Sequence, residues 1–421
     1  MSRIKVGVFS LVLITLFLYP ILPQYVYITG SVNVVNGLLA VFILLYILLC
    51  GKFTKITSKD IPLYWLFLLI MAVSYYVDAG LLKTATYSMS FIVLPWILIT
   101  VINTEKRFIR AIDILILAGA FIGILGIIEA ALKINFIQFM AREDIEFFHE
   151  IRYGLLRIMT TFGQPIAYGL YQVFVIVLIN YRKSISNCEK RLNICYAISV
   201  LNIFMSVSRI AIIAYILVQI LMTYKGSKKK FVNYLVIAMI GLMFFLIVST
   251  SAGFKIPLID DLLETLNQLL AGNTKSSGST VGFGDRFELW TWVYLSMGDK
   301  WLAGHGPTAE FAYKVYEWQT KKSIENQYLN ILWHNGFVGL ISMLLSYSSI
   351  LAYSFKRRNN FLTYDKGCIS FNSVVFFMML VYYIVEFGIQ ESDISRIYTV
   401  FVALMIAYNR IEVMNRKGVN R

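Results

Sequence analysis

The sequence predicts an all-α polytopic membrane protein with about twelve transmembrane helices and one large outer loop. Two observations support this prediction. Of the 421 residues, 58% are hydrophobic and only 15% are charged, whereas soluble domains carry roughly 25% charged residues. The charged residues gather in short clusters between apolar runs of about 17–23 residues, and such a run is long enough to cross ~30 Å of hydrocarbon.

The expected spans follow one another along the whole chain. The first begins with Met-Ser-Arg-Ile-Lys and continues without a small-residue cleavage site, so we expect a retained helix rather than a cleaved signal peptide. The twelve expected spans are 6–28, 32–50, 61–77, 85–103, 111–132, 161–181, 193–208, 210–224, 231–250, 326–355, 369–388 and 396–410.

Lysine and arginine cluster in every second connection between these spans. By the positive-inside rule the basic connections face the cytoplasm, which also places both termini there and predicts a multi-pass protein of the cytoplasmic (inner) membrane. The formal net charge of +14 is then a topology signal and not the sign of a nucleic-acid partner. The basic clusters are Lys52–Lys59, Lys106–Arg110, Arg182–Arg191, Lys225–Lys230, Lys356–Lys366 and Arg416–Arg421.

The alternating connections are expected outside, and they divide the chain into three parts. Residues 1–250 carry helices one to nine, 251–325 form the large outer loop, and 326–421 carry the last three helices and a cytoplasmic tail. Within the loop, 257–271 has helical apolar spacing and 272–280 is typical of a flexible polar linker. A shorter outer connection, 133–160, mixes charged and apolar residues and is expected to form a helix lying along the membrane.

Ionisable residues are scarce in the middle of the spans. Glu129 and Glu386 lie near outer ends, and Asp113 lies near an inner end. Proton- and ion-coupled transporters usually carry their working charges near the bilayer midplane. The charge distribution therefore favours chemistry at the outer surface over transport.

Arg209 lies between two apolar spans in the stretch Ser-Val-Ser-Arg, with almost no loop around it. It is either a snorkelling interfacial arginine or an anion site. Because guanidinium matches phosphate oxygens in a bidentate way, the natural ligand of such a site is a phosphate group.

The end of the outer loop collects further candidates. Arg286 precedes Trp290 by one helical turn, and an ion pair with a neighbouring carboxylate is its simpler explanation. The tryptophans of this stretch form either an interfacial aromatic belt or platforms for sugar rings. His305 lies in the predicted tight turn Gly-His-Gly-Pro, where a structural role is as plausible as substrate binding.

Glu325 and Asn326 open the tenth expected span, with Ser323 as the expected N-cap. A glutamate in the first turn is favoured by the helix dipole whatever its function. A carboxylate held near two arginines is also what a general base requires. The outer loops show no pair of carboxylates at metal-ligand spacing, so no metal and no cofactor is expected.

Several of these motifs together resemble the bacterial O-antigen polymerase/ligase superfamily. The similarity lies in Ser-Arg after the seventh span, Arg-x-x-x-Trp, the Gly-x-Gly turn, and Glu-Asn-x-Tyr-Leu opening a helix that continues Gly-Phe-Val-Gly-Leu. The stretch 160–169, with Arg157 just before it, resembles the family segment Gly-x-Phe-x-x-Pro. The motifs lie within about 157–340, while the predicted topology is similar from end to end.

The resemblance implies a glycosyltransferase of GT-C-like architecture that acts outside the cytoplasmic membrane on polyprenyl-diphosphate-linked sugars. Arg209 and Arg286 would hold the diphosphate of the lipid carrier, and Glu325 would be the base or would position the acceptor. Arg157, Trp290, His305, Asn326 and Tyr328 would bind substrate. The ligase branch commonly has histidine where this chain has Glu325, which favours a polymerase.

The expected function is polymerisation of undecaprenyl-diphosphate-linked repeat units of O-antigen, capsule or exopolysaccharide by inverting, metal-independent transfer. Lipopolysaccharide biosynthesis is one pathway this would serve. The alternatives are a ligase for the finished glycan and a transporter for the lipid-linked oligosaccharide. Expected partners are the lipid-linked oligosaccharide and the bilayer, and a polysaccharide chain-length regulator is a further candidate.

Overall fold

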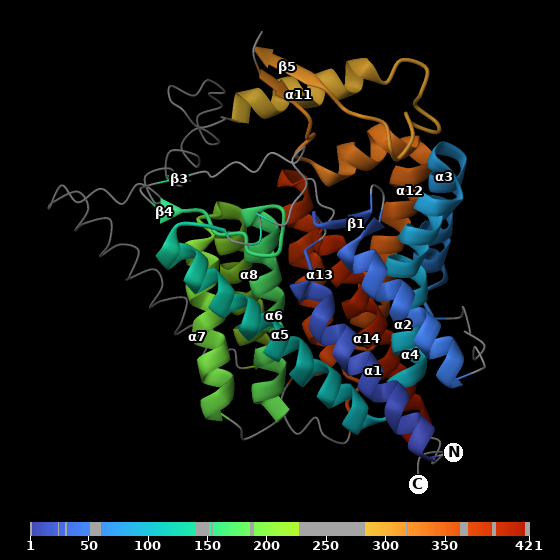
Figure 1. The fold of residues 1–421 in the computed structure, drawn as a ribbon, viewed down its shortest axis with the longest axis vertical. Helices are drawn as coiled ribbons and strands as arrows, with labels where there is room; N and C mark the ends of the chain where they lie inside the picture. Colours follow the sequence, from blue (N-terminus) through green and yellow to red (C-terminus); the bar gives the residue numbers. More distant parts are fainter. Residues whose placement is uncertain are drawn as a thin grey trace, which may run out of the picture.

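The computed structural model of the chain is a mostly helical bundle with three small antiparallel hairpins (Figure 1). It describes residues 2–23, 25–29, 32–50, 60–135, 137, 139, 151–152, 155–185, 189–226, 283–316, 319–362, 369–389 and 393–416.

The helices of the bundle follow the expected spans closely. They are α1 (Ser2–Ile21), α2 (Val34–Cys50), α3 (Pro62–Ser88), the π-helical turn η1 (Met89–Val93), α4 (Leu94–Val101), α5 (Glu105–Leu132), α6 (Pro165–Ile185), α7 (Glu189–Met205), α8 (Arg209–Gly226), α12 (Gln327–Lys356), α13 (Phe371–Val385) with the 3₁₀ turn η3 (Glu386–Gly388), and α14 (Asp393–Arg416). Helices thus occupy eleven of the twelve expected stretches, and the other, 231–250, lies outside the described residues.

Five helical segments in the described part are long and apolar enough to cross a membrane: Pro62–Val101, Glu105–Leu132, Gln327–Lys356, Phe371–Gly388 and Ile394–Arg416. Three shorter apolar helices accompany them, at Gly7–Ile21, Val34–Leu49 and Arg209–Met222. The chain is therefore an all-α membrane protein, while the number of twelve spans and the GT-C-like architecture remain predictions.

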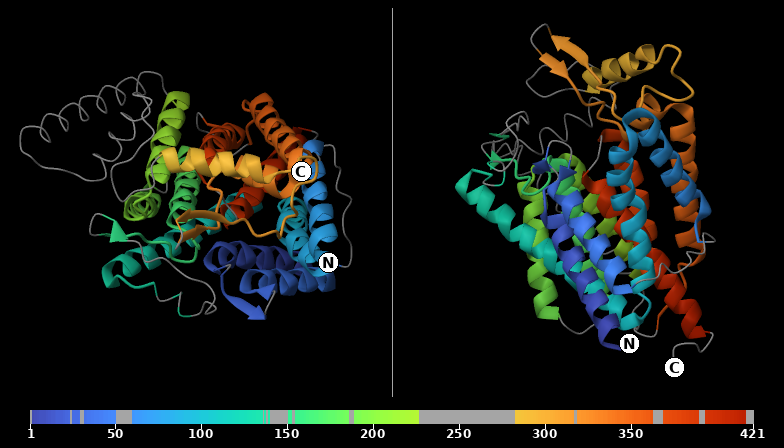
Figure 2. Two further views of the ribbon diagram at one scale, coloured as in Figure 1. Left: turned by 90° about the horizontal axis from the view of Figure 1, so that it is seen from above. Right: turned by 45° about the vertical axis from the view of Figure 1, so that its right-hand side comes forward.

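One end of the bundle is covered by a separate layer, and we call it the loop end. The layer consists of α11 (Phe283–Ser296) and the hairpin β5 (Tyr313–Tyr316) with β6 (Gln319–Lys321), which lie across the helix ends (Figures 1 and 2). It has an apolar core of its own, in which Leu289 and Val293 of α11, and Met297 just after this helix, pack with Ile324 and Trp333. The start of α1 and the end of α14 lie together at the opposite end of the bundle.

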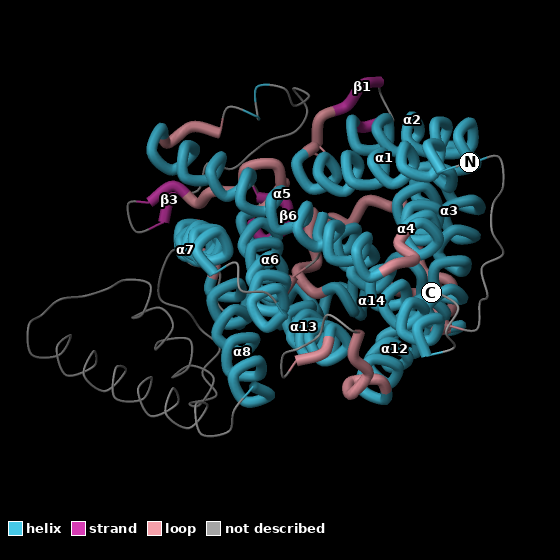
Figure 3. The backbone as a smooth tube through the Cα atoms, turned by 90° about the horizontal axis from the view of Figure 1, so that it is seen from below, coloured by secondary structure: helices cyan, strands magenta, loops and turns pink. Residues whose placement is uncertain are grey.

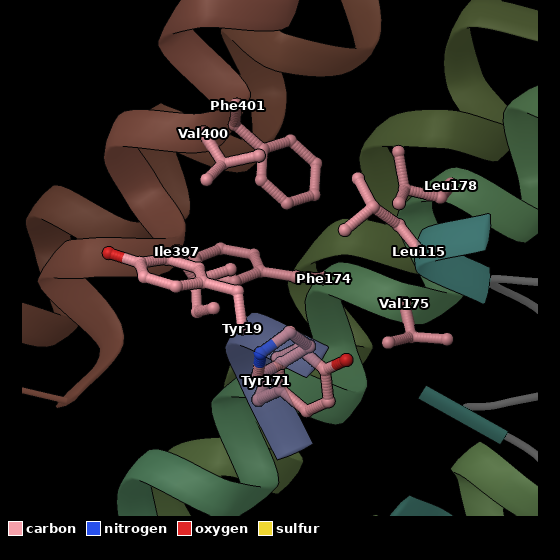
Figure 4. A pocket seen from close by; sticks show the side chains of 10 residues that line it. Tyr19, Leu115, Tyr171, Phe174, Val175, Leu178, Ile397, Val400 and Phe401 are labelled. Atoms are coloured by element: carbon pink, nitrogen blue, oxygen red, sulfur yellow. The ribbon is translucent and has the colours of Figure 1, made fainter. Parts of the chain in front are cut away.

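Helices α6 and α14 lie inside the bundle, between the other helices (Figure 3). Their side chains are buried almost throughout. A small apolar pocket lies between these two helices, α1 and α5 (Figure 4). Phe174 of α6 and Phe401 of α14 line it together with Leu115 of α5. Its lining carries no charged side chain, so it does not extend the polar sites at the loop end.

Two helices of the bundle are broken by glycine. At Gly80 the dihedral angles are φ 77° and ψ −171°, and at Gly336 they are φ 63° and ψ −164°. In a straight helix Tyr75 and Tyr87 would be about 18 Å apart, yet their rings stack at 5.0 Å. The chain therefore reverses at Gly80, between the two spans expected at 61–77 and 85–103.

Most of the connection 133–160, in which a membrane-surface helix is expected, lies outside the described residues, so that expectation stays a prediction. Residues 151–156 contain the antiparallel strands β3 (Ile151–Arg152) and β4 (Leu155–Leu156). The sequence between them is Tyr153–Gly154, and a two-residue connection with glycine favours a hairpin over a helix. A third hairpin, β1 (Tyr27–Thr29) with β2 (Val32–Asn33), links α1 to α2.

Candidate functional site

Arg209 is the first residue of α8, at the loop end of the bundle. The preceding Ser208 caps the helix, because its Oγ accepts a hydrogen bond of 3.3 Å from the Ala211 N–H and its carbonyl accepts one of 3.1 Å from the Ile212 N–H. The N-terminus of a helix carries partial positive charge, and a cation is disfavoured there unless an anion is bound. Arg209 thus adds a cationic side chain to the partially positive start of α8.

The Arg157 segment lies beside the same turn. The Ile158 N–H donates to the Met205 carbonyl at 3.5 Å, which ties the segment to the last residue of α7. Farther along, Gly169 of α6 approaches Ser206 and Ala211 so closely that a larger residue would collide with them. Arg157 and Arg209 are thus carried by neighbouring segments.

Thr160 is fixed from three sides in a left-handed conformation, with φ 47°. Its N–H donates to Glu129 Oε2 at 2.8 Å, and the Met159 N–H donates to Glu129 Oε1 at 3.2 Å. The Thr160 carbonyl accepts from the Tyr25 hydroxyl at 2.7 Å and from Asn135 Nδ2 at 3.1 Å. Glu129, only 2% exposed, therefore anchors the segment that follows Arg157.

Replacing Glu129 by glutamine should test this anchor. A glutamine amide can accept only one of the two backbone hydrogen bonds, so a buried N–H loses its acceptor, at a cost of about 1–3 kcal/mol. We expect a lower unfolding temperature of the purified protein in detergent. Glu310→Gln, at an exposed carboxylate of the loop-end layer, is the control, and equal unfolding temperatures for the two variants would contradict the anchoring role.

Glu325 immediately precedes the N-cap of α12 and is also left-handed, with φ 54°. The N-cap is Asn326, whose Oδ1 accepts from the Leu329 N–H at 3.1 Å. The expected N-cap, Ser323, is therefore wrong, and Glu325 lies outside the first turn. Asparagine caps as well as serine does, and the sequence offered both within four residues.

Asn326 also joins two helices. Its Nδ2 donates to the carbonyl of Phe387, just beyond α13, at 3.2 Å. Tyr328 repeats this connection, because its hydroxyl donates to the Tyr383 carbonyl at 2.8 Å and its ring stacks on Phe387 at 4.4 Å. Both predicted substrate-binding residues thus hold the start of α12 against the end of α13.

Left-handed backbone is concentrated in the motif segments. Among the described residues, five non-glycine residues have positive φ, and Thr160, Val207 and Glu325 are three of them. This conformation is costly for a β-branched residue such as Val207. Strained residues of this kind persist where the surrounding structure over-determines them, and they cluster at functional sites.

The Gly-His-Gly-Pro turn fits into the break of α12 at Gly336. The N–H groups of His305 and Gly306 donate to the carbonyls of Trp333 and His334, both at 2.9 Å. In return, the Phe337 N–H donates to the Trp301 carbonyl at 2.8 Å. The loop therefore supplies the backbone hydrogen bonds that the broken helix has lost.

His305 is placed inside this assembly. Its ring stacks on Trp333 at 4.4 Å, and its Nε2 lies 3.1 Å from the Ser296 carbonyl. The Ser296 hydroxyl accepts from Trp333 Nε1 at 3.0 Å. Through these contacts His305 connects α11 to α12. Its predicted contact with the substrate stays a prediction.

The remaining predicted residues lie on α11. Trp290 is half-buried and packs against the core of the loop-end layer, which also contains Ile324. Arg286 lies one turn before Trp290 on the same helix, and its side chain is outside the described atoms. Trp290 thus packs against the cluster that contains Ile324, the residue before Glu325, and α11 carries Arg286 in this layer.

Helix packing connects the part of the site around Arg209 to the part around Glu325 and Asn326. Helix α8 packs along α13, and Asn326 bonds to the end of α13. Both contacts bring motif residues to the loop end, where Figure 1 shows the start of α8 and the end of α13. The catalytic and binding roles of the predicted residues remain predictions.

Sequence reasoning missed Arg396 of α14, which is completely buried. Its Nη1 donates to the carbonyls of Tyr19 and Leu22 at the end of α1, at 3.2 and 3.4 Å. Its guanidinium carbon lies 5.4 Å from the Tyr19 ring and 5.8 Å from the Phe162 ring, so it also supports the segment after Arg157. An arginine at the edge of an apolar span was the available signal.

Asp78, beside the reversal at Gly80, was also missed. Its Oδ2 accepts from the Thr308 N–H at 2.8 Å and from the Thr308 hydroxyl at 2.6 Å. Nearby, Asn335 Nδ2 donates to the Ser74 hydroxyl at 2.7 Å. These bonds attach α3 to the glycine turn and to the broken part of α12. The sequence also places Glu129 and Glu386 near the outer ends of their spans, but it predicts no contact for either.

Residues 194–344 match the family model described as O-antigen ligase. The match runs from α7 through Arg209, the described part of the outer loop and Glu325 to the middle of α12. No curated protein matches the chain. The family match confirms the resemblance that the motifs indicated, to the O-antigen polymerase/ligase superfamily.

Proposed function

We propose that this protein is an integral membrane polymerase of undecaprenyl-diphosphate-linked oligosaccharide repeat units. It transfers a growing glycan from one lipid carrier to the non-reducing sugar of another repeat unit, on the outer face of the cytoplasmic membrane. The product is O-antigen, capsule or exopolysaccharide, and the transfer inverts the anomeric centre without a metal ion. Both chain termini are cytoplasmic in this proposal, and the loop end faces outward.

The observation that carries the proposal is the position of Arg209 at the first turn of α8, within the family match. Glycosyl transfer from a lipid diphosphate releases an anionic leaving group, and its growing charge must be stabilised. An arginine and a helix N-terminus at one place supply both a bidentate donor and oriented N–H groups. Fixed positive groups in a site of low dielectric act strongly on such charge.

Glu325 is the proposed base. It takes the proton from the acceptor hydroxyl, the acceptor oxygen bonds to the anomeric carbon, and the bond to the diphosphate oxygen breaks. The diphosphate leaves with the electron pair, and Arg209 and Arg286 hold it. The left-handed backbone at Glu325 and the Asn326 cap fix where the side chain begins.

A ligase for finished glycan is the second candidate, favoured by the description of the matched family. The carboxylate at position 325, where the ligase branch commonly has histidine, favours the polymerase. The products separate the two activities. Cells lacking a polymerase place single repeats on the acceptor, whereas cells lacking a ligase accumulate polymer on the lipid carrier.

Arg209→Ala tests the proposal. We expect chain elongation to fall roughly 10²–10³-fold, the loss that follows removal of one donor to a developing oxyanion. Arg209→Lys should recover only part of it, because lysine lacks the bidentate fork. The measurement is the length distribution of surface glycan at equal protein abundance in the membrane.

Arg358→Ala, at the opposite end of the bundle, is the matched control and should leave chain lengths unchanged. Normal chain lengths in Arg209→Ala would contradict the diphosphate site. Polymer that remains on the lipid carrier would assign the protein as a ligase instead.

A further inference from the structure

Exposed apolar side chains form a patch where the loop-end layer meets α12. The patch consists of Tyr294 of α11, Trp301 and Leu302 in the turn that follows, and Phe337 and Val338 just after the break of α12. Leu302 is 71% exposed, Tyr294 64% and Val338 45%. A contiguous exposed group of such side chains indicates an interaction surface. We call this group the boundary patch.

The boundary patch is held in place by ring and backbone contacts. The ring centroids of Tyr294 and Trp301 are 5.0 Å apart, and those of Trp301 and Phe337 are 5.5 Å apart. The Phe337 N–H donates to the Trp301 carbonyl at 2.8 Å, and the Val338 N–H donates to the Leu302 carbonyl at 3.3 Å. These contacts fix the turn, and with it Leu302, beside the broken helix.

Helix α12 continues the boundary patch as an exposed apolar stripe. Ile341, Leu344 and Leu345 are between 43% and 53% exposed, and they follow Phe337 and Val338 at helical spacing. The helix is long and apolar enough to cross a membrane. In a membrane protein, an exposed stripe on such a helix faces the lipid chains. The boundary patch is therefore continuous with a lipid-facing surface.

The length of α12 places the boundary patch at the edge of the hydrocarbon. At about 1.5 Å per residue, the helix from Phe337 to Lys356 is about 28 Å long. A bilayer core is ~30 Å thick. Because Lys356 ends the helix and Arg357 and Arg358 follow it, one hydrocarbon boundary lies there. Phe337 consequently lies at the other boundary, and Trp301 beside it lies at the level of the lipid head groups.

We infer that the boundary patch is a membrane anchor, in which Tyr294, Trp301 and Leu302 enter the head-group region of the lipid leaflet at the loop end. Tryptophan and tyrosine favour this region because their rings combine an apolar body with a polar group. The exposed Lys300 adds a positive charge that phospholipid phosphate attracts. Trp333, by contrast, is 6% exposed and lies in the core of the loop-end layer. The anchor sets the height of this layer above the membrane.

Spin-label accessibility tests the anchor. Leu302→Cys is made in the full chain with its four native cysteines replaced by alanine. The protein carries a nitroxide label and lies in nanodiscs of phosphatidylethanolamine and phosphatidylglycerol. Collisions with oxygen report exposure to lipid, and collisions with a water-soluble nickel chelate report exposure to water. We expect the ratio of oxygen to nickel collisions to be several-fold higher than in Glu288→Cys, the matched control at an exposed residue of α11 outside the boundary patch.

Equal ratios at positions 302 and 288 would show that Leu302 faces water and would overturn the anchor. Low collision rates with both reagents at position 302 would overturn it too, because protein would then cover the boundary patch. Dipolar broadening between labels would identify that protein as a second copy of the chain. Ile341→Cys should give the highest ratio of the three, and a low ratio there would remove the lipid-facing surface on which the anchor depends.

If the cysteine-free chain does not accumulate, tryptophan quenching replaces the labels. The native chain and Trp301→Phe are compared in nanodiscs whose lipids carry bromine on the acyl chain near the head group. The variant should be quenched less, because it lacks a tryptophan that contacts lipid, and equal quenching would overturn the anchor. Neither measurement depends on glycan transfer, so failure of the anchor would leave the proposed function standing.

Discussion

Glu325→Gln is expected to abolish glycan polymerisation while the protein accumulates normally in the membrane. Loss of a positioned general base lowers a rate by about 10²–10⁴-fold. Glutamine has nearly the shape of glutamate and can adopt the same backbone conformation, φ 54°. The Asn326 cap and its bond to Phe387 do not involve the carboxylate, so the start of α12 should remain in place.

The measurement is the rate of elongation by purified protein, together with the surface glycan length in cells. Glu310→Gln is the control, since it removes an exposed carboxylate of the same layer. Long chains made at a normal rate by Glu325→Gln would remove this residue from the chemistry. A loss of protein from the membrane would show that the carboxylate has a structural role instead.

Gly336→Ala is expected to destabilise the fold strongly, although it adds only one methyl group. The residue has φ 63° and ψ −164°, a backbone region that is essentially limited to glycine and costs other residues about 1–3 kcal/mol. Its new Cβ would also fall against the backbone of Leu302 and Ala303, and backbone cannot rotate away as a side chain can. With overpacking added, the free energy of unfolding should fall by roughly 2–6 kcal/mol.

Gly298→Ala separates the conformational cost of a positive φ from the cost of overpacking. Gly298 also has a positive φ, 50°, but nothing lies within 4 Å of a Cβ there. Gly298→Ala should therefore lower the free energy of unfolding only by the conformational cost, about 1–2 kcal/mol. Denaturant unfolding in detergent measures both, and equal losses would mean that the loop and the broken helix do not fit as closely as the hydrogen bonds indicate.

Much of this architecture follows directly from the residue pattern. Apolar runs of span length must be helical in lipid, because every backbone polar group there needs an internal partner. The helices of the bundle consequently fall where the sequence predicts them in the described part of the chain, whereas α11 lies outside the expected spans. Glycine at the tight Gly-His-Gly-Pro turn was likewise predictable, since Gly304 and Gly306 have φ of 75° and 103°.

Local pattern is less informative at the places where two capping residues or two backbone conformations compete. Ser323 and Asn326 are both good N-caps, and the choice of Asn326 depends on its second bond, to Phe387. The connection 133–160 has an apolar and charged mixture that suits a surface helix, yet its described end forms β3 and β4. The sequence alone identifies neither the Phe387 carbonyl as the partner of Asn326 nor β4 as the partner of β3.

Composition and short-range periodicity were enough to establish the fold class, the positions of the described helices and the motif order that indicates the superfamily. Which distant groups meet is set only by the folded arrangement. Glu129 anchors Thr160 from 31 residues away, and Arg396 supports the end of α1 across the whole chain. Glu386 likewise meets the Tyr347 hydroxyl only because α12 packs against the end of α13. Such contacts depend on how the helices pack, and hydrophobic periodicity does not encode that packing.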